Sequence, residues 1–124
     1  MPTFIACLLS GKGTWSEVLK IVNAKEWNKV FLITNDFGKQ NFQNNNPLVE
    51  LIVVDSYYPD PSSLTKSIIK QLQGKINDFE IALNFASGTG KEHMALMEAI
   101  LELGLNFRLV TLKNGEVEVM GMER

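Results

Sequence analysis

Apolar residues occur along the chain in short runs that are separated by longer amphipathic or polar stretches. The runs are TFIACLL (3–9), VFLIT (30–34), VELIVVD (49–55), EIALNF (80–85) and FRLVTL (107–112). Because they are short, rich in β-branched residues and almost continuously apolar, they predict strands that are covered on both faces. Between them, stretches 15–26, 62–76 and 90–103 predict helices, and Gly104 is placed to serve as a C′ cap of the last one.

Strands that alternate with helices predict an α/β fold with a Rossmann-like, doubly wound and mostly parallel sheet. The C-terminal part departs from this rule, because Asn114-Gly115 between FRLVTLK and EVEVM is the signature of a type I′ hairpin. The last two strands are therefore expected to form an antiparallel pair at one edge of the sheet. Segment 37–47 (FGKQNFQNNNP) predicts a polar loop, and residues 1–124 are expected to form a single domain.

Charge and composition narrow the classes of function. The net charge of −2 provides no overall positive field that would attract duplex nucleic acid. A bound anion must therefore be held locally, by backbone amides and a few lysines. The chain has one cysteine, Cys7, and one histidine, His93, which cannot form a zinc site of the usual spacing, so no metal or other cofactor is expected.

The N-terminal apolar run is too short to span a membrane and lacks the positive region of a signal peptide. A buried Cys7 in a reducing compartment is the simplest interpretation of the single thiol. We therefore expect a cytoplasmic protein that makes no membrane contact.

A Ser-Gly-x-Gly turn occurs twice, each time between a predicted strand and a predicted helix. The first copy is SGKGTWSEVL and the second is SGTGKEHMAL. Each contains a capping-box pattern, Thr14-x-x-Glu17 and Thr89-x-x-Glu92. Such chemistry is also the ordinary choice for strand-to-helix loops, so the repetition does not by itself establish a site.

The second turn is not the phosphate loop of an ATPase. Phe85 and Glu92 occupy the positions where that loop requires a glycine and a Ser or Thr. In a doubly wound sheet, however, ligands bind outside the carboxyl ends of the two strands between which the strand order reverses. The two turns follow the first and fourth predicted strands, where that reversal is expected.

Two helix N-termini would then face one crevice, with Lys12 and Lys91 in the turns beside them. This arrangement predicts an anion site, and the simplest anion is phosphate. Asn84 ends the fourth predicted strand. It is placed either to contact a ribose hydroxyl or an adenine edge, or to bond the backbone of its own turn.

This part of the chain resembles the second signature of CARF domains, the CRISPR-associated Rossmann folds. In that family a strand ends in Asn-x-(Ser/Thr)-(Ser/Gly)-Gly-Thr before a helix whose Met or Leu faces the sheet. The stretch LNFASGTGKEHMALMEAILELG matches the pattern at Asn84, Ser87, Gly88 and Thr89. Met94 falls where a methionine often occurs, whereas Ala86 departs from the usual hydroxyl residue and removes one possible ligand contact.

The first CARF signature, a polar turn after the first strand, is matched loosely by Ser10, Gly11, Gly13 and Thr14. The order of elements, with an antiparallel final hairpin, is similar to the CARF core across essentially the whole chain. The resemblance implies binding of cyclic oligoadenylate, the second messenger of type III CRISPR defence, across a homodimer. The implied ligand-binding residues are Gly11, Lys12, Gly13, Thr14, Asn84, Ser87, Gly88, Thr89 and Gly90.

We expect cyclic tetra-adenylate, because its four phosphates suit the four helix N-termini of a dimer. The family pattern alone does not fix the ring size. CARF proteins usually carry an effector domain, and no such domain is expected within these 124 residues. The chain is thus a ring nuclease that degrades the messenger, a non-catalytic sensor or scaffold for a separate effector, or a fragment of a longer protein.

CARF-type ring nucleases are similar to this chain in a Ser after the first strand and a Lys in the second turn. By that similarity, Ser10 would position the attacking ribose 2′-OH or the phosphate, and Lys91 would stabilise the oxyanion, without a metal. The alternative for Lys91 is a solvated residue at a helix start.

A dinucleotide site is the rival enzyme hypothesis. GKGTWS reads as G-x-G-x-x-S, which differs from the dinucleotide fingerprint at one residue. Asp36 follows at about the customary spacing of some twenty residues. The third glycine is absent, so Ser16 would have to allow close packing of helix and strand.

Three further features have two interpretations each. Trp15 either stacks on an adenine or anchors the first helix to the sheet or to a partner. His93 is an acid or base, or it lies on the solvent side or against a loop. The apolar spacing of Met94, Leu96, Met97, Ile100 and Leu101 predicts a helix face that packs into the core rather than a cofactor site.

Overall fold

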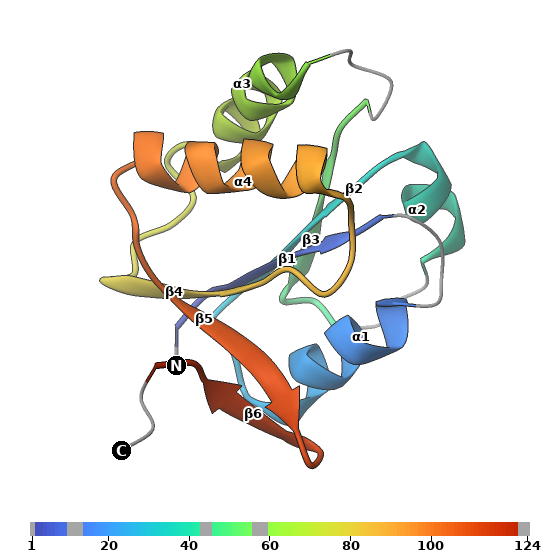
Figure 1. The fold of residues 1–124 in the computed structure, drawn as a ribbon, viewed down its shortest axis with the longest axis vertical. Helices are drawn as coiled ribbons and strands as arrows, with labels where there is room; N and C mark the ends of the chain where they lie inside the picture. Colours follow the sequence, from blue (N-terminus) through green and yellow to red (C-terminus); the bar gives the residue numbers. More distant parts are fainter. Residues whose placement is uncertain (1, 10–13, 43–45, 56–59, 122–124) are drawn as a thin grey trace.

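The computed structural model describes residues 2–9, 14–42, 46–55 and 60–121. In chain order the elements are β1 (Phe4–Leu8), α1 (Trp15–Ala24), β2 (Val30–Thr34), α2 (Asp36–Asn41), β3 (Val49–Val53), α3 (Pro61–Leu72), β4 (Glu80–Asn84), α4 (Gly90–Glu102), β5 (Asn106–Lys113) and β6 (Glu116–Val119). Strands and helices alternate up to β5, as the hydrophobic pattern predicts (Figure 1).

The strands form one six-stranded sheet in the order β3-β2-β1-β4-β5-β6. β1 pairs in parallel with both β2 and β4, β3 extends the sheet beyond β2, and β5 extends it beyond β4. Among the strand pairs of the described residues, only the last, β5 with β6, is antiparallel. The predicted fold class is confirmed, and the strand order reverses between β1 and β4, as expected.

Helices cover both faces of the sheet, with α3 and α4 on one side and α1 and α2 on the other (Figure 1). β1 lies at the centre, and every one of its residues is buried. Its side chains alternate between the layers, so that Ile5 and Cys7 contact the α3–α4 layer and Phe4, Ala6 and Leu8 the α1 layer. This double coverage explains the nearly continuous apolar runs, because a strand buried on both faces has no solvent side.

The predicted cap at the end of α4 and the predicted turn of the hairpin are both confirmed. Gly104 has a φ of 70°, its N–H donates to Leu101 O at 3.1 Å, and the N–H of Leu105 donates to Ile100 O at 3.1 Å. This is the Schellman pattern that satisfies the last carbonyls of a helix. Asn114 and Gly115 have φ values of 53° and 80°, as a type I′ turn requires.

The start and end of α3 are also set by local residues. Asp60 accepts a hydrogen bond from the N–H of Ser63, and Pro61 occupies the first turn, where its missing N–H costs nothing. The helix ends at Leu72, earlier than the expected residue 76, and Gly74 follows with a φ of 79°. A glycine in the left-handed region terminates a helix efficiently.

The expectation of a polar loop over 37–47 was wrong for its first part, where α2 forms. Asn35 caps this helix by accepting a hydrogen bond from the N–H of Gly38 at 3.0 Å. A side chain at Gly38 would place its Cβ 1.7 Å from Thr34 Oγ1, which itself donates to Leu8 O at 2.7 Å. The capping box expected at Thr14 was also wrong, because the Thr14 side chain makes no capping hydrogen bond.

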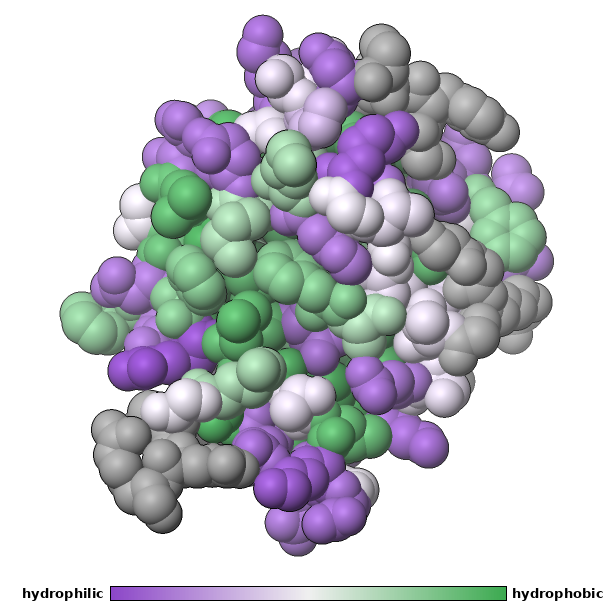
Figure 2. Space-filling view, viewed as in Figure 1, coloured by the Kyte–Doolittle hydropathy of each residue, from purple (hydrophilic) through white to green (hydrophobic). Residues whose placement is uncertain are grey.

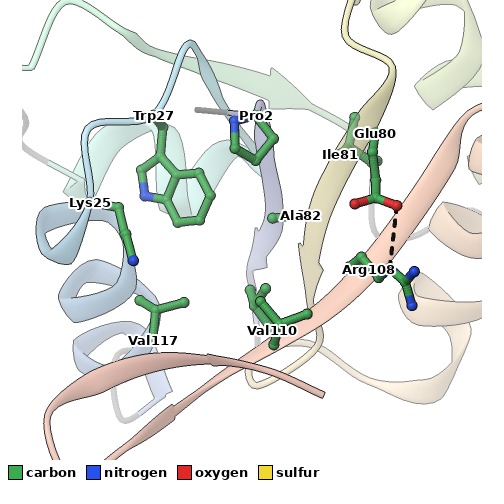
Figure 3. A pocket seen from close by; sticks show the side chains of 10 residues that line it. Pro2, Lys25, Trp27, Glu80, Ile81, Ala82, Arg108, Val110 and Val117 are labelled. Carbon is green, nitrogen blue, oxygen red and sulfur yellow. Dashed lines mark ion pairs between the residues drawn. The ribbon is translucent and has the colours of Figure 1, made fainter. Parts of the chain in front are cut away.

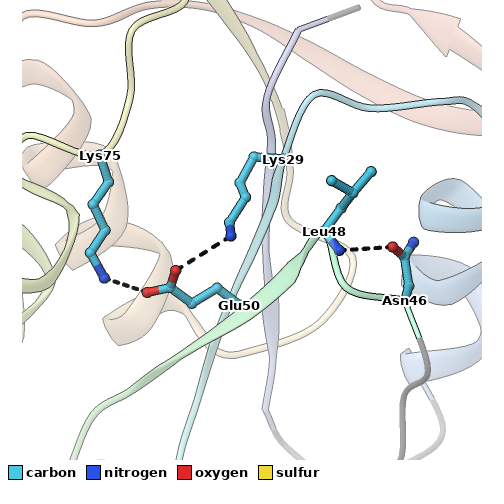
Figure 4. A network of polar contacts seen from close by, with 5 residues as sticks. All are labelled: Lys29, Asn46, Leu48, Glu50 and Lys75. Carbon is cyan, nitrogen blue, oxygen red and sulfur yellow. Dashed lines mark hydrogen bonds and ion pairs between the residues drawn. The ribbon is translucent and has the colours of Figure 1, made fainter.

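The edge strand β3 carries a charged cluster (Figure 4). Glu50 lies 3.6 Å from Lys29 and also forms an ion pair with Lys75. The hydrogen bond from Lys75, followed by the charges of both lysines, holds the pKa of Glu50 below its usual value. Nearby, the N–H of Leu48 donates to Asn46 Oδ1 at 2.9 Å (Figure 4). Charged side chains on an edge strand discourage pairing with another sheet.

The close approach of α2 to β2 predicts the effect of one substitution. Gly38→Ala should lower the free energy of unfolding by about 1–3 kcal/mol, because the added methyl must displace Thr34 and its hydrogen bond to Leu8. Urea denaturation gives the measurement. Gln40→Ala, on an exposed position of the same helix, is the matched control and should change stability by less than about 0.5 kcal/mol. Equal stabilities of the two variants would contradict this packing.

Candidate functional site

One buried hydroxyl joins the end of β1 to the turn that follows β4. Ser87 is fully buried, and its Oγ donates to Leu9 O at 2.7 Å and accepts from Leu9 N at 3.0 Å. Both backbone groups of Leu9 are thus satisfied by a residue from the second turn. The second turn therefore lies against the residue that follows β1, at the carboxyl ends of neighbouring strands, where ligands bind in doubly wound sheets.

Asn84 ends β4 and is also buried. Its Nδ2 donates to Val110 O at 2.9 Å, and its Oδ1 accepts from the N–H of Ala86 at 2.9 Å. Of the two expected roles, the structure shows the second, since the side chain bonds the backbone of its own turn. It also connects that turn to β5. Both the amide nitrogen and the amide oxygen of Asn84 bond protein backbone, so this side chain supports the turn rather than facing a ligand.

Gly88 and His93 complete the frame of the second turn. Gly88 has a φ of 104°, and a Cβ there would lie 3.0 Å from His93 Nε2. That nitrogen lies 2.7 Å from the carbonyl oxygen of Ser87, so it is the protonated nitrogen and donates to the turn. The imidazole packs against Phe85, with the ring centroids 4.8 Å apart. Of the expected roles for His93, contact with a loop is the one observed.

The start of α4 contains its own carboxylate. The predicted capping box forms, with Glu92 accepting from Thr89 N at 3.2 Å and from the Thr89 hydroxyl. Glu92 is buried, and its negative charge offsets part of the positive potential of the helix N-terminus. Thr89 and Gly90 are exposed at this edge, and Lys91 is half-buried beside them.

Cys7 lies beneath the second turn and is not a candidate nucleophile. Burial, with a smaller contribution from the negative charge of Glu92, raises the pKa of its thiol to about 12. A thiol with this pKa stays protonated at neutral pH, and only the thiolate reacts. Cys7 is therefore a core residue, in agreement with the sequence-based interpretation.

A small cleft opens at the carboxyl ends of β4 and β5, on the face of the sheet that α1 covers. Its volume is about 220 Å³, and its walls include Glu17, Asn84, Ala86, Thr111 and Met120. Sites for drug-sized ligands usually have volumes of about 300–1,000 Å³. A ligand as large as a cyclic oligonucleotide would therefore extend well beyond this cleft, over the surface around the second turn.

The sequence-predicted residues of the first turn, Ser10, Gly11, Lys12 and Gly13, lie outside the described residues. Thr14 is exposed and immediately precedes α1. The described members of the predicted site divide into two groups. Asn84, Ser87 and Gly88 form its frame, whereas Thr89, Gly90 and Lys91 lie at the surface of the frame or close to it.

Trp15 anchors α1 to α2. It is 6% exposed, and its ring centroid lies 6.1 Å from that of Phe37 and 6.4 Å from that of Phe42. Within the described part of the chain, the indole Nε1 is buried without a hydrogen-bond partner. These aromatic contacts correspond to the anchoring role and leave little of the ring exposed for stacking on an adenine.

The interpretation of the apolar positions of α4 was only partly right. Leu96 and Ile100 are buried in the core, as expected. Met94 is 63% exposed and Leu101 57% exposed, so these two do not pack into the core. Met94 therefore does not face the sheet, which departs from the family pattern. α4 packs against α3, and the side of α4 that carries Met94 and Leu101 faces outward.

In the described part of the chain, no group of three or more His, Cys, Asp or Glu residues is positioned to hold a metal ion. None of the described helices has the length and apolar character needed to cross a membrane.

The chain matches no protein-family model and no curated protein. The CARF interpretation thus depends on the sequence motif and on the position of that motif in the fold.

Glu92, His93, Phe85, Leu9 and Val110 contribute to the site without having been predicted as ligand-binding residues. Glu92 had a sequence signal, the capping-box spacing, and His93 had been considered as an acid or base or as a residue against a loop. The roles of Leu9 and Val110 depend on their backbone groups, which carry no mark in the sequence. Long-range contacts of this kind become visible only once the strands are paired.

The Ser87 bridge predicts a clear loss of stability on its removal. Ser87→Ala should lower the free energy of unfolding by about 2 kcal/mol, because it leaves both backbone groups of Leu9 buried without this partner. Ser16→Ala, at an exposed position of α1, is the matched control and should change stability by less than about 0.5 kcal/mol. Urea denaturation compares the two, and a Ser87→Ala protein as stable as the parent would contradict the bridge.

Proposed function

We propose that this protein binds cyclic oligoadenylate across a homodimer and degrades it as a metal-independent ring nuclease. Cyclic tetra-adenylate is the ring we expect. The observation that carries the proposal is the junction at the sheet reversal, where Ser87 of the second βα turn bonds Leu9, the residue that follows β1. The Asn-x-x-Ser-Gly-Thr motif that resembles the CARF signature lies at this junction.

Charge at this edge supports an anionic ligand only if lysines contribute. Glu92 already offsets the positive end of α4, so the helix dipole of that element is not sufficient for a phosphate. Lys91 is the cation that the described residues offer next to the exposed Thr89 and Gly90. Lys12, in the first turn of the sequence, would add a second cation. A homodimer would contribute two copies of each lysine.

The homodimer is supported by an exposed apolar strip on α4. Met94 and Leu101 are both largely exposed, and Leu101 follows Met94 by seven positions, about two helical turns. The half-buried Met97 lies between them. Apolar side chains gather on this face of the molecule (Figure 2). Exposed apolar surface of this kind marks contact sites, and Met94 is one turn from Lys91, so pairing here would bring two copies of Lys91 towards one ligand.

The proposed reaction needs no group other than the ring itself and the protein. The ribose 2′-OH attacks the adjacent phosphorus, the O2′–P bond forms and the P–O5′ bond breaks. The products are a 2′,3′-cyclic phosphate and a 5′-hydroxyl, which receives a proton in place of the one lost from the 2′-OH. Lys91 stabilises the negative charge of the phosphorane, and Ser10 positions the attacking hydroxyl or the phosphate.

The function is tested with radiolabelled cyclic tetra-adenylate in EDTA, followed on native and denaturing gels. We expect linear products with a 2′,3′-cyclic phosphate. Lys91→Ala should slow cleavage by about 10²–10³-fold, the usual effect of removing one donor that stabilises developing charge. Lys70→Ala, on the exposed last turn of α3, is the matched control and should cleave normally.

Two other outcomes of this experiment would contradict the ring-nuclease function. A ligand that is shifted but remains intact would replace the nuclease by the sensor or scaffold. Neither a shift nor cleavage with rings of any size would refute binding of cyclic oligoadenylate. The dinucleotide alternative then becomes testable, because an Asp36→Ala protein should lose affinity for a dinucleotide.

The dimer is tested independently of the ligand. Met94→Glu should convert the protein to a monomer in sedimentation equilibrium and weaken binding of cyclic tetra-adenylate by at least about tenfold, because a buried unpaired charge opposes association. Phe79→Glu, which introduces the same charge at a residue that is 87% exposed and outside α4, should leave both unchanged. A Met94→Glu dimer of parental affinity would exclude this face as the interface.

A further inference from the structure

A second hollow lies away from the βα turns, where β4 begins. It has a volume of about 360 Å³ and opens between the end of α1 and the β5–β6 hairpin (Figure 3). Pro2, just before β1, and Glu80, the first residue of β4, lie on its rim. Because parallel strands begin at the edge opposite to the one where they end, this hollow is separate from the candidate site.

The hollow exists because the layer over the sheet is incomplete here. α1 ends at Ala24, and the residue of β4 below it, Ala82, has only a methyl side chain. Val110 of β5 and Val117 of β6 form the remaining floor and wall (Figure 3). All three are apolar, so water in this space finds few hydrogen-bond partners and is readily displaced by an apolar group.

One wall of the hollow is a tryptophan in a fixed position. The Trp27 indole donates from Nε1 to Ile21 O at 3.0 Å, and its ring stacks on Phe4 with centroids 5.0 Å apart. Only 6% of Trp27 is exposed, and the ring borders the hollow (Figure 3). A wall that is already ordered loses little entropy when a ligand binds, which favours affinity.

The charges at the rim select for an anion. Arg108 Nε lies 3.3 Å from Glu80 Oε2, so these two charges largely offset each other. Lys25 also lines the hollow, and within the described part of the chain it makes no ion pair. The rim therefore has a net positive charge next to an apolar interior.

We propose that this hollow is a binding site for a small amphiphile, with an apolar body between Trp27 and the valines and one anionic group at Lys25. The volume lies at the lower end of the range for small-molecule sites, which limits the body to one that is compact. The inference does not depend on binding of cyclic oligoadenylate, because Trp27 and Lys25, which carry it, lie outside the candidate site, although Val110 borders both.

The experiment compares two fluorescent probes that differ mainly in charge. The anionic probe is 8-anilinonaphthalene-1-sulfonate, and N-phenyl-1-naphthylamine has the same rings without the sulfonate. In a Trp15→Phe protein, Trp27 is the only tryptophan and serves as energy donor to the bound probe. We expect saturable binding of one probe per chain, with the anionic probe bound more tightly.

Charge reversal separates the anion contact from the apolar one. Lys25→Glu should weaken the anionic probe by roughly tenfold and change the neutral probe by less than about twofold, because an attraction becomes a repulsion. Lys20→Glu makes the same change at an exposed residue of α1 that does not line the hollow, and it should affect neither probe. Equal effects of the two substitutions would overturn the assignment of Lys25.

Filling the hollow tests the apolar contact. Ala82→Leu should abolish binding of both probes, because the added atoms occupy the space. If this variant does not fold, Val119→Gln, at a lining residue that is 36% exposed, should block the hollow without disturbing the core or adding a charge. Undiminished binding in a folded blocking variant, or more than one probe per chain, would refute the site. Binding that weakens as the protein concentration rises would instead assign the hollow to a second copy of the chain.

Discussion

The hydrogen bonds between the Ser87 hydroxyl and the backbone of Leu9 are the constraint on which the candidate site depends. They join residues that lie 78 positions apart, and no water can replace them because Ser87 is fully buried. With Ser87 fixed, the chain must turn sharply at Gly88, whose positive φ allows His93 to reach the Ser87 carbonyl. The position of α4 relative to the central strand β1 follows from this chain of contacts.

The residues of the signature motif perform different tasks because they differ in burial. Asn84, Ser87 and Gly88 hold the second turn in place against β5 and Leu9, so substitutions there act first on stability. Thr89, Gly90 and Lys91 follow at the surface, where a ligand could reach them. A rigid buried frame beneath exposed polar groups is the arrangement that preorganised sites use, because the frame is ordered before the ligand arrives.

The two edges of the sheet offer contrasting environments. The edge with the βα turns has helix starts, hydroxyl groups and a lysine, whereas the hollow near the start of β4 is apolar with a cationic rim. Val110 takes part in both, because its carbonyl accepts from Asn84 and it also lines the hollow. One residue of β5 therefore connects the frame of the proposed nucleotide site to the proposed amphiphile site.

The sequence by itself determined the alternation of strands and helices, the hairpin at Asn114-Gly115 and the cap at Gly104, because periodicity and turn chemistry act between near neighbours. It did not predict α2, which has a glycine at its centre and depends on the Asn35 cap and on the fit of Gly38 against Thr34. Only the tertiary structure decided that Met94 and Leu101 are exposed, since this depends on which side of α4 packs against α3 and the sheet. The tasks of Asn84 and Ser87 were decided in the same way, because their partners are 26 and 78 residues away and are brought near only by strand pairing.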